Sequence, residues 1–596
     1  MKKLFNDYSY DFTKKSKNYI DTIVENEYEN IFRVYKKTIF NLNKKLDEIY
    51  FQNKINSPTR RVNIIYDYHK RYFNLLVSSI TIDRIIEINN QKMMQVDVYK
   101  EELNLSSRYI NYYAVICNEL NDYFKIEFKD GIIDFGSIDK KFKTTPKFII
   151  SRFLLYDFKF LFYKLISRSG FLKKGLYLSF GSNLLKKEIQ TELLKYGYKP
   201  ILIDNIFDGN KDFNLNNYDS KKNQDYFNEI FEIALNELNE IKLFFKNQNI
   251  FTVYIKIISK LILESVLYVL ENKNFMRNKI KLLIKKNPNI KVCISNGLFN
   301  RKGILLYDAL NFNNISVLAC QHGLTAGNAK SYLQNNFITE NNTSDTLFCY
   351  NKSAVRTRKK IIKSNTKLLA VGGPKFSKQI FNRKLLRYFL KLRFRLREKQ
   401  FLYLSFNVEF NSGKGFPYTK SNSKIFKSEK SILKILSKSS KKIIYKGYPT
   451  KQFLFDREKE LKLLYGDKIK FLNNNIDFRY FRPLVDVIIT GATESTLEWC
   501  IGSNVPIIFL YSRKINPLES KLVEKIFENC FIFFDADSKS GLLKFKKTLN
   551  LSYRDILKIW NKKQKYRDQY DEEHFLSKNK EAGKIAANYI LDQIEN

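Results

Sequence analysis

Two hydroxyls and a carboxylate stand within four consecutive residues, as Ser495, Thr496 and Glu498, inside the run 485–510. In this run a β-rich segment is followed by a turn of small residues, then by an apolar helix, and then by a second β-rich segment. In a parallel sheet this order places the turn and the helix N-terminus at the carboxyl edge, where open α/β folds bind ligands. The helix N-terminus attracts phosphate, and Glu498 lies one turn into the helix, within reach of a ribose diol.

The same spacing has a purely structural interpretation. Ser495 and Glu498 form the pattern of a capping box, in which the two side chains accept hydrogen bonds from otherwise unpaired backbone N–H groups at a helix start. The spacing alone therefore does not decide between a helix cap and a ligand site.

A second chemically informative run lies at 291–327. Its pattern predicts a strand at 292–295 and a turn at Asn296 and Gly297. A helix up to residue 310 and a second strand at 316–319 follow. This order delivers Gln321, His322 and Gly323 to the carboxyl end of a strand. A neutral imidazole, with a pKa near ~6.5, can accept a proton there as a general base. Alternatively, His322 binds a phosphate or the loop by hydrogen bonds.

Both runs resemble motifs of a known enzyme class. The run 491–498, GATESTLE, resembles the nucleotide-sugar corner of GT-B glycosyltransferases, where a Gly/Thr/Ser-rich turn precedes a helix with a Glu on the donor ribose. The Gln321-His322-Gly323 motif and the later turn at Gly373 resemble the passage between the two domains of bacterial polysaccharide GT-B enzymes. Within that class, residues 175–590 are most similar to surface-carbohydrate and capsule transferases.

The resemblance implies roles for individual residues. His322 is the candidate base, with Glu409 and Asp308 as weaker candidates. In the stretch KGYP, which stands where the related motif is K-x-HP, Lys446 is kept and Tyr448 replaces the His, so Lys446 is the expected anion contact. The full donor-binding set is Gly491, Glu494, Ser495, Thr496, Glu498, Lys446, Ser412, Gly413 and Lys414. The residues expected to shape the cleft are Gln321, Gly323, Asn296, Gly297 and Gly373.

The resemblance also implies an α/β fold of the GT-B type, with two Rossmann-type parallel-sheet domains facing a cleft. The 596 residues suffice for two or three domains. A strand–helix–strand pattern at 175–204 agrees with this architecture. The resemblance also implies that the helical end at 555–596 finishes with a helix that crosses back onto the first domain. We expect an N-terminal extension of mixed structure and unknown role at 1–150, an acceptor-side domain at 151–375, and a donor domain with terminal helices at 376–596.

The chain is strongly basic, with 104 Lys and Arg against 61 Asp and Glu and a formal net charge of +43. Such an excess favours anionic partners. The run 382–400 sets basic residues around an aromatic and aliphatic stripe with almost no acid. An anionic membrane surface explains this composition, and so does the general Lys and Asn bias of the chain. Nucleic acid is not an expected partner, because no recognised nucleic-acid motif occurs.

The number and spacing of Cys and His residues limit the kinds of disulfide and metal site that the chain can form. The six Cys form no C-x-x-C pair, which indicates reduced thiols, and three His leave no His-rich metal site. We expect neither a metal nor a cofactor. The first residues lack an apolar core and no apolar run reaches about 18 residues, so we expect no signal peptide and no spanning helix. The expected location is the cytoplasm, with peripheral contact to the inner face of the plasma membrane.

These observations favour a metal-independent glycosyltransferase that moves a sugar from a nucleotide-sugar donor to a surface-polysaccharide or glycolipid acceptor. A CDP-glycerol-type glycerophosphotransferase shares the His-Gly architecture and is an alternative, and nucleotide-sugar 2-epimerases share the fold. A catalytically inactive module that binds glycan or lipid is another, because Tyr448 departs from the related motif.

Overall fold

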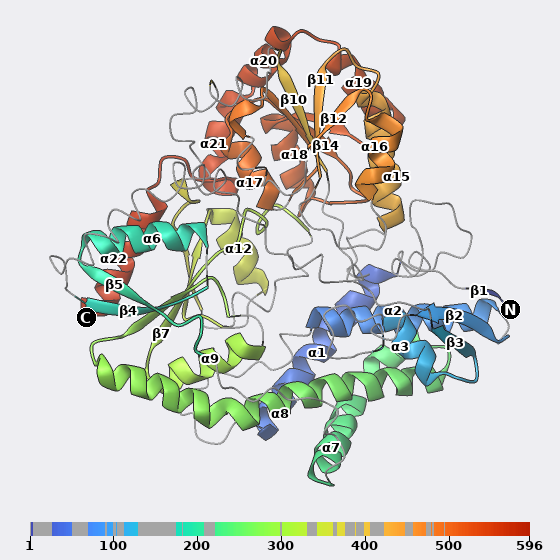
Figure 1. Ribbon diagram of the computed structural model, residues 1–596, viewed down its shortest axis with the longest axis vertical. Coiled ribbons are helices and arrows are strands. Elements are labelled where there is room, and N and C mark those ends of the chain that lie inside the picture. Colours follow the sequence, from blue (N-terminus) through green and yellow to red (C-terminus); the bar gives the residue numbers. More distant parts are fainter. Residues whose placement is uncertain are drawn as a thin grey trace.

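Two six-stranded parallel sheets and one three-stranded parallel sheet organise the computed structural model (Figure 1). The structure describes residues 2–3, 27–50, 69–89, 92–98, 103, 112–128, 175–181, 183–207, 221–298, 301–330, 343–361, 366–375, 388, 398–405, 422–447, 457–472, 478, 482–493 and 495–595.

The first large sheet has the strand order β5-β4-β6-β7-β8-β9, and every neighbouring pair is parallel. Strands β6 and β8 are buried along their whole length, as expected for a parallel sheet that is covered by helices on both faces. The strands are β4 (Gly175–Phe180), β5 (Tyr198–Leu202), β6 (Val292–Ser295), β7 (Ser316–Cys320), β8 (Thr346–Cys349) and β9 (Lys367–Ala370).

Alternate side chains of this sheet enter two different cores. Cys293 and Val317 belong to the core that includes α8 and α9, whereas Val292 and Ile294 belong to the core that includes α6. This period of two is what a strand buried on both faces requires. The helices around the sheet are α6 (Leu184–Lys195), α7 (Lys221–Glu237), η5 (Asn239–Phe244), α8 (Gln248–Lys286), α9 (Arg301–Phe312) and α12 (Lys352–Ile361).

The second large sheet has the order β12-β11-β10-β13-β14-β15 and is also wholly parallel. Its strands are β10 (Gln400–Leu404), β11 (Lys442–Lys446), β12 (Ile469–Phe471), β13 (Val487–Thr490), β14 (Ile507–Tyr511) and β15 (Ile532–Asp535). The helices of this part are α15 (Asn422–Leu436), α16 (Arg457–Tyr465), η7 (Arg482–Leu484), α17 (Ser495–Gly502), α18 (Lys521–Cys530) and α19 (Lys539–Leu549).

Both strand orders reverse direction once, and these switch points locate ligand sites in open α/β sheets. In the second sheet the order corresponds to 3-2-1-4-5-6, so the switch lies between β10 and β13. In the first sheet it lies between β4 and β6. The predicted α/β fold with two Rossmann-type parallel sheets is confirmed by these topologies.

The N-terminal elements pack beside the first sheet rather than apart from it. Helices α1 (Tyr28–Tyr50), α2 (His69–Ile88) and α3 (Tyr112–Glu119) share one hydrophobic core with α7 and α8. The Asp83 carboxylate accepts the backbone N–H groups of Lys246 and Asn247 at 2.7 and 3.0 Å, just before α8 begins. The small sheet of β1 (Lys2–Lys3), β2 (Met94–Val98) and β3 (Phe124–Phe128) completes this region.

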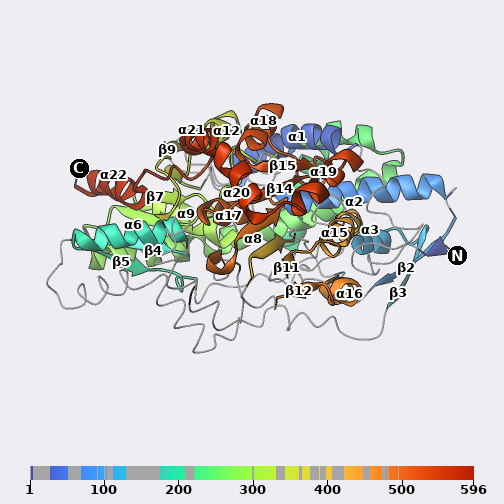
Figure 2. The same ribbon diagram turned by 90° about the horizontal axis from the view of Figure 1, so that it is seen from above.

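The chain ends with three helices, and the last crosses back to the first sheet. These are α20 (Tyr553–Lys562), α21 (Gln564–His574) and α22 (Ala582–Glu595). Helix α22 lies against α6, and both views show the two helices side by side (Figures 1 and 2). The contact is close, because a Cβ atom at Gly583 would lie 2.8 Å from Glu188 Cβ. The family resemblance implies such a return.

The predicted helical end and the predicted strands of both informative runs are confirmed, with boundary shifts of one or two residues. The run 382–400 lies outside the described residues except at Tyr388 and 398–400. Among the described residues, no helix is long and apolar enough to cross a membrane.

Candidate functional site

The turn after β13 lies at the switch point of the second sheet. Leu404 of β10 pairs with Thr490 of β13, so the loops that follow these two strands leave the sheet side by side. The Thr490 hydroxyl accepts the N–H of Ala492 at 3.1 Å, which fixes the turn that begins at Gly491. The loop after β10, with the predicted Glu409, Ser412, Gly413 and Lys414, lies outside the described residues, as does Glu494.

Helix α17 presents its first turn at this switch point. Ser495 and Thr496 are half-buried, whereas Glu498 is only 3% exposed. Burial, followed by the nearby Glu498 carboxylate, raises the pKa of the Tyr350 phenol well above its usual range. Tyr350 directly follows β8 of the first sheet, so Glu498 lies at the junction between the two sheets.

Lys446 ends β11, the neighbour of β10 on the other side of the switch point. Its side chain is buried, and its ammonium donates to the carbonyl of Gly447 at 2.8 Å. The backbone N–H of Ser405 donates to the Lys446 carbonyl at 3.0 Å. The structure therefore places this cation at the carboxyl edge of the second sheet, where a bound anion would have to draw it from the Gly447 carbonyl.

At the switch point of the first sheet, Gly181 and Asn296 meet. Gly181 has φ +72°, which strains other residues, and a Cβ atom there would lie 2.2 Å from Asn296 Oδ1 and displace that amide. The Gly181 N–H donates to Asp204 at 2.7 Å, and Gly297, with φ +103°, continues the neighbouring turn.

Lys186, which the sequence patterns did not single out, is buried beneath the Gly181 loop. Its ammonium donates to the carbonyls of Phe180 and Gly181 at 2.7 and 2.5 Å. Burial lowers its pKa, opposed by Cys293, Cys320 and Asp204. Its geometry is that of a clamp on the loop carbonyls.

Gln321 is a fully buried positioning residue. Its Nε2 donates to the Gly323 carbonyl at 2.7 Å, and its Oε1 accepts the Tyr350 N–H at 3.2 Å. Asn183, the N-cap of α6, donates to the Gln321 carbonyl at 3.0 Å. These bonds fix the turn in which His322 is exposed.

Gly323 joins the two sheets. It has φ +72°, and a Cβ atom there would lie 2.6 Å from Ser495 Cβ and 3.1 Å from Ser495 Cα. The Tyr350 phenol also takes a hydrogen bond from the Gly323 backbone. The carboxyl edges of the two sheets therefore meet where the two predicted motifs touch, although about 170 residues separate these motifs in the sequence.

Two other residues predicted for the site, Gly373 and Asp308, make contacts that support the structure. Gly373 donates its N–H to the Leu576 carbonyl at 2.8 Å, which ties the passage between the sheets to the segment after α21. Asp308 binds Arg277 through two bonds of 2.8 Å on the buried side of α9. This bidentate ion pair occupies both oxygens of Asp308, which disfavours its role as a base.

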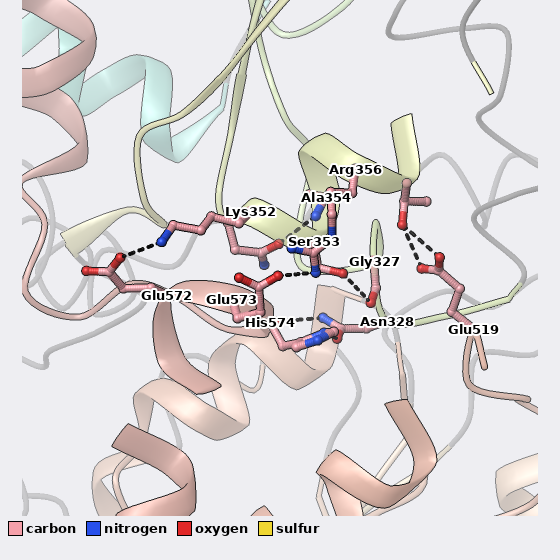
Figure 3. A network of polar contacts seen from close by, with 12 residues as sticks. Gly327, Asn328, Lys352, Ser353, Ala354, Arg356, Glu519, Glu572, Glu573 and His574 are labelled. Carbon is pink, nitrogen blue, oxygen red and sulfur yellow. Dashed lines mark hydrogen bonds and ion pairs between the residues drawn. The ribbon is translucent and has the colours of Figure 1, made fainter. Parts of the chain in front are cut away.

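A polar network beside the site connects α12 and the loop after β7 to α21 (Figure 3). The Asn328 amide donates to the His574 carbonyl at 2.8 Å, and Ser353 donates to the Gly327 carbonyl at 3.1 Å. Thr357 donates to both oxygens of Glu519 at 2.8 and 2.9 Å. The surrounding ion pairs are Lys352 with Glu572, and Arg356 with Glu573.

This network was not predicted, although its charges left a signal in the sequence. The run 571–574, DEEH, is acidic and the run 352–360, KSAVRTRKK, is basic. Charge complementarity between distant runs indicates which helices attract each other, but it does not say how they pack. Because the network spans both sheets, it restricts how they move relative to each other.

We expect His574 to make the stability of this network depend on pH. The His574 Nδ1 atom lies 3.4 Å from Asn328 Oδ1. Burial lowers the pKa of His574, and the positive charge of Arg356 lowers it further. Glu573 and a backbone hydrogen bond with Gly327 partly offset this lowering. A depressed folded-state pKa means that the unfolded chain binds the proton first. We expect the free energy of unfolding to fall as the pH drops below ~6.5 towards the folded-state pKa. Thermal unfolding of the wild type and of His574→Asn is measured between about pH 8 and 5. The variant should lose the part of the pH dependence of stability that His574 causes. An equal pH dependence in both proteins would contradict this expectation.

No family model and no curated protein matches the sequence. Among solved structures, a glycosyltransferase from Rickettsia africae ESF-5 is 13% identical, with a TM-score of 0.38, over 71% of this chain and 99% of that one. The Anabaena protein Alr3699/HepE in complex with UDP and glucose is 9% identical, with a TM-score of 0.39, over 70% of this chain and 100% of that one. The UDP-GlcNAc 2-epimerase from Neisseria meningitidis bound to UDP-GlcNAc is 12% identical, with a TM-score of 0.35, over 70% and 100%.

These TM-scores are low, so the fold assignment rests on the strand orders of the two sheets. Within the part of the chain that the structure describes, no group of three or more His, Cys, Asp or Glu side chains could hold a metal ion. The described site consists of backbone N–H groups, hydroxyls, amides, one exposed imidazole, the buried Glu498 carboxylate and the buried ammonium groups of Lys446 and Lys186.

Proposed function

We propose that this chain is a GT-B-type glycosyltransferase that moves a sugar from a nucleotide-sugar donor to a surface-polysaccharide or glycolipid acceptor. The contact of Gly323 with Ser495 carries the proposal. It brings the turn after β7 to the start of α17, at the switch point of the second sheet. A donor bound at that switch point would present its sugar towards the first sheet.

The donor would be held by the second sheet. The N-terminus of α17, with Ser495 and Thr496, suits the diphosphate, because its N–H groups and dipole favour negative charge. Lys446 and the loop 412–414 would add positive charge as the nucleotide leaves. Glu498 is 3% exposed and therefore shielded from bulk water. In this environment its hydrogen bond to a ribose hydroxyl would be stronger than in solvent.

The acceptor would approach from the first sheet. His322 is exposed in the turn that Gln321 fixes, one residue from the contact with Ser495. As a general base it would take the proton of the acceptor hydroxyl while the new bond to the sugar forms and the bond to the nucleotide phosphate breaks. Asn296 and Gly297, at the switch point of the same sheet, would line the acceptor side. The run 382–400 would bring the enzyme to an anionic membrane.

A nucleotide-sugar donor is expected to stabilise the protein through Glu498. At a hundredfold excess over the dissociation constant, a ligand of the native state adds about 2.7 kcal/mol. Thermal unfolding is measured with UDP-, GDP-, dTDP-, CMP- and CDP-linked sugars, with CDP-glycerol, and with glycans that carry no nucleotide. One nucleotide family is expected to stabilise the wild type, and Glu498→Gln, which keeps the size of the side chain, is expected to lose the effect.

Glu264→Gln is the matched control, because Glu264 is equally buried, at 1% exposure, but lies on α8. It should keep the full stabilisation by the donor. Equal stabilisation of the wild type and Glu498→Gln would contradict the donor site. Stabilisation by CDP-glycerol alone would favour glycerophosphate transfer, and stabilisation by glycans alone would favour a binding module.

A further inference from the structure

The C-terminal half of α8 has one face that is exposed among the residues that the structure describes. Asn272, Met276 and Ile280 are buried against the rest of the protein, whereas the opposite side is exposed. Figure 1 shows α8 along the lower edge of the molecule, away from the second sheet. Helix α9 packs on one flank of α8.

This exposed face carries two large apolar and three basic side chains, together with the polar Glu271, Asn274 and Asn278. Phe275 and Leu282 are 41% and 59% exposed, and they lie seven residues apart, so they form one ridge along the helix. Lys286 lies on one side of the ridge, and Lys281 and Lys285 lie on the other; all three are exposed. We call Phe275, Lys281, Leu282, Lys285 and Lys286 the α8 face.

The run 272–291, which follows Glu271, carries charge of a single sign. From Asn272 to Lys291 the chain contains seven Lys and Arg and no Asp or Glu. Glu271 is exposed one turn before Phe275. Arg277, turned towards α9, is neutralised by Asp308 at 2.8 Å. The exposed lysines of the α8 face therefore meet little opposing charge from their own helix.

We propose that the α8 face is a docking surface for an anionic lipid bilayer. The apolar ridge would enter the boundary between head groups and acyl chains, and the lysines on its two sides would bind the lipid phosphates. A nucleic acid would bind the lysines but would leave Leu282 exposed. Stacking of a base on Phe275 would compete with Lys279, whose ammonium lies 4.8 Å from the centre of that ring. This docking surface extends the proposed function, which places the enzyme at a membrane. Its test measures vesicle binding and requires no enzyme turnover.

Co-sedimentation of the full-length protein with lipid vesicles tests the proposal. Vesicles of phosphatidylcholine alone are compared with vesicles of equal parts phosphatidylcholine and phosphatidylglycerol. The wild type is expected to bind the anionic vesicles. The combined substitution Lys281→Gln, Lys285→Gln and Lys286→Gln is expected to weaken binding on the order of 10–100-fold, as is usual for the loss of several lysines near an anionic membrane. All three side chains are exposed, so unchanged thermal unfolding should accompany the loss.

Helix α19 offers a control matched in charge and exposure. Leu543 is 59% exposed, the same as Leu282, and Lys544, Lys546 and Lys547 are exposed beside it. Substituting these three lysines by Gln lowers the net charge equally and should leave vesicle binding unchanged. Equal losses in both triple variants would overturn the proposal, because the whole charge of the protein would then be responsible.

A second measurement reports the insertion of the ridge. The emission of Phe275→Trp should shift to shorter wavelength on anionic vesicles, and Leu543→Trp should show no shift. Vesicle binding without a shift at position 275 would overturn the proposed contact. So would a lysine variant of the α8 face that loses affinity for single-stranded RNA while its vesicle binding stays at the wild-type level.

Discussion

Replacing His322 by Asn is expected to lower kcat by about 10²–10⁴-fold while leaving donor binding unchanged. Among the described site residues, His322 combines exposure, a place beside the Gly323 contact with Ser495, and an imidazole nitrogen that can accept a proton. Asn keeps similar size and hydrogen bonding but cannot take the proton of an acceptor hydroxyl. The loss should therefore fall on the chemical step.

Steady-state kinetics over a range of pH, with the donor found by thermal unfolding, checks this result. A general base gives kcat a limb that rises with pH, and this limb should disappear in His322→Asn. His574→Asn is the control, because His574 lies buried in the neighbouring network and should not change kcat by a comparable factor. A His322 variant with weaker donor binding and unchanged kcat would instead show that the imidazole binds the donor phosphate.

Local patterns were sufficient to predict the elements that carry the site. The order of strand, turn and helix around Ser495 and around His322 follows from short-range periodicity, which depends on neighbours within a few residues. The rule that ligands bind at carboxyl edges then led to the expectation that both motifs lie at a ligand site. The resemblance to GT-B enzymes added the expectation that the last helix returns to the first domain, as α22 does.

The contacts between the sheets could not be predicted in this way. Whether Gly323 meets Ser495 depends on the packing of elements that lie far apart in the chain. The buried bonds of Gln321 and the clamp of Lys186 depend on side-chain direction, which periodicity does not contain. The position of Glu498 against Tyr350 likewise becomes visible only when both sheets are in place.

Replacing Gly323 by Ala is expected to destabilise the junction by about 2–5 kcal/mol. A left-handed backbone conformation costs a residue with a Cβ atom roughly 1–2 kcal/mol. Forcing a methyl group into a filled space costs about 1–3 kcal/mol more, and here it would lie 2.6 Å from Ser495 Cβ. Thermal and urea unfolding of the variant measure the loss, and donor-induced stabilisation should fall with it, because Ser495 begins the helix that would bind the donor.

A double-mutant cycle separates the two causes of this loss. Ser495→Gly removes the Cβ atom but leaves the Cα at 3.1 Å, so it should recover part of the overlap cost and none of the backbone cost. Gly327→Ala is the matched control, because Gly327 has φ +81° and its neighbour is Ser353 on α12. It should be destabilised similarly but should not couple to Ser495→Gly. Additive effects of Gly323→Ala and Ser495→Gly would show that the edges separate in solution, and the donor site would then have to form without the first sheet.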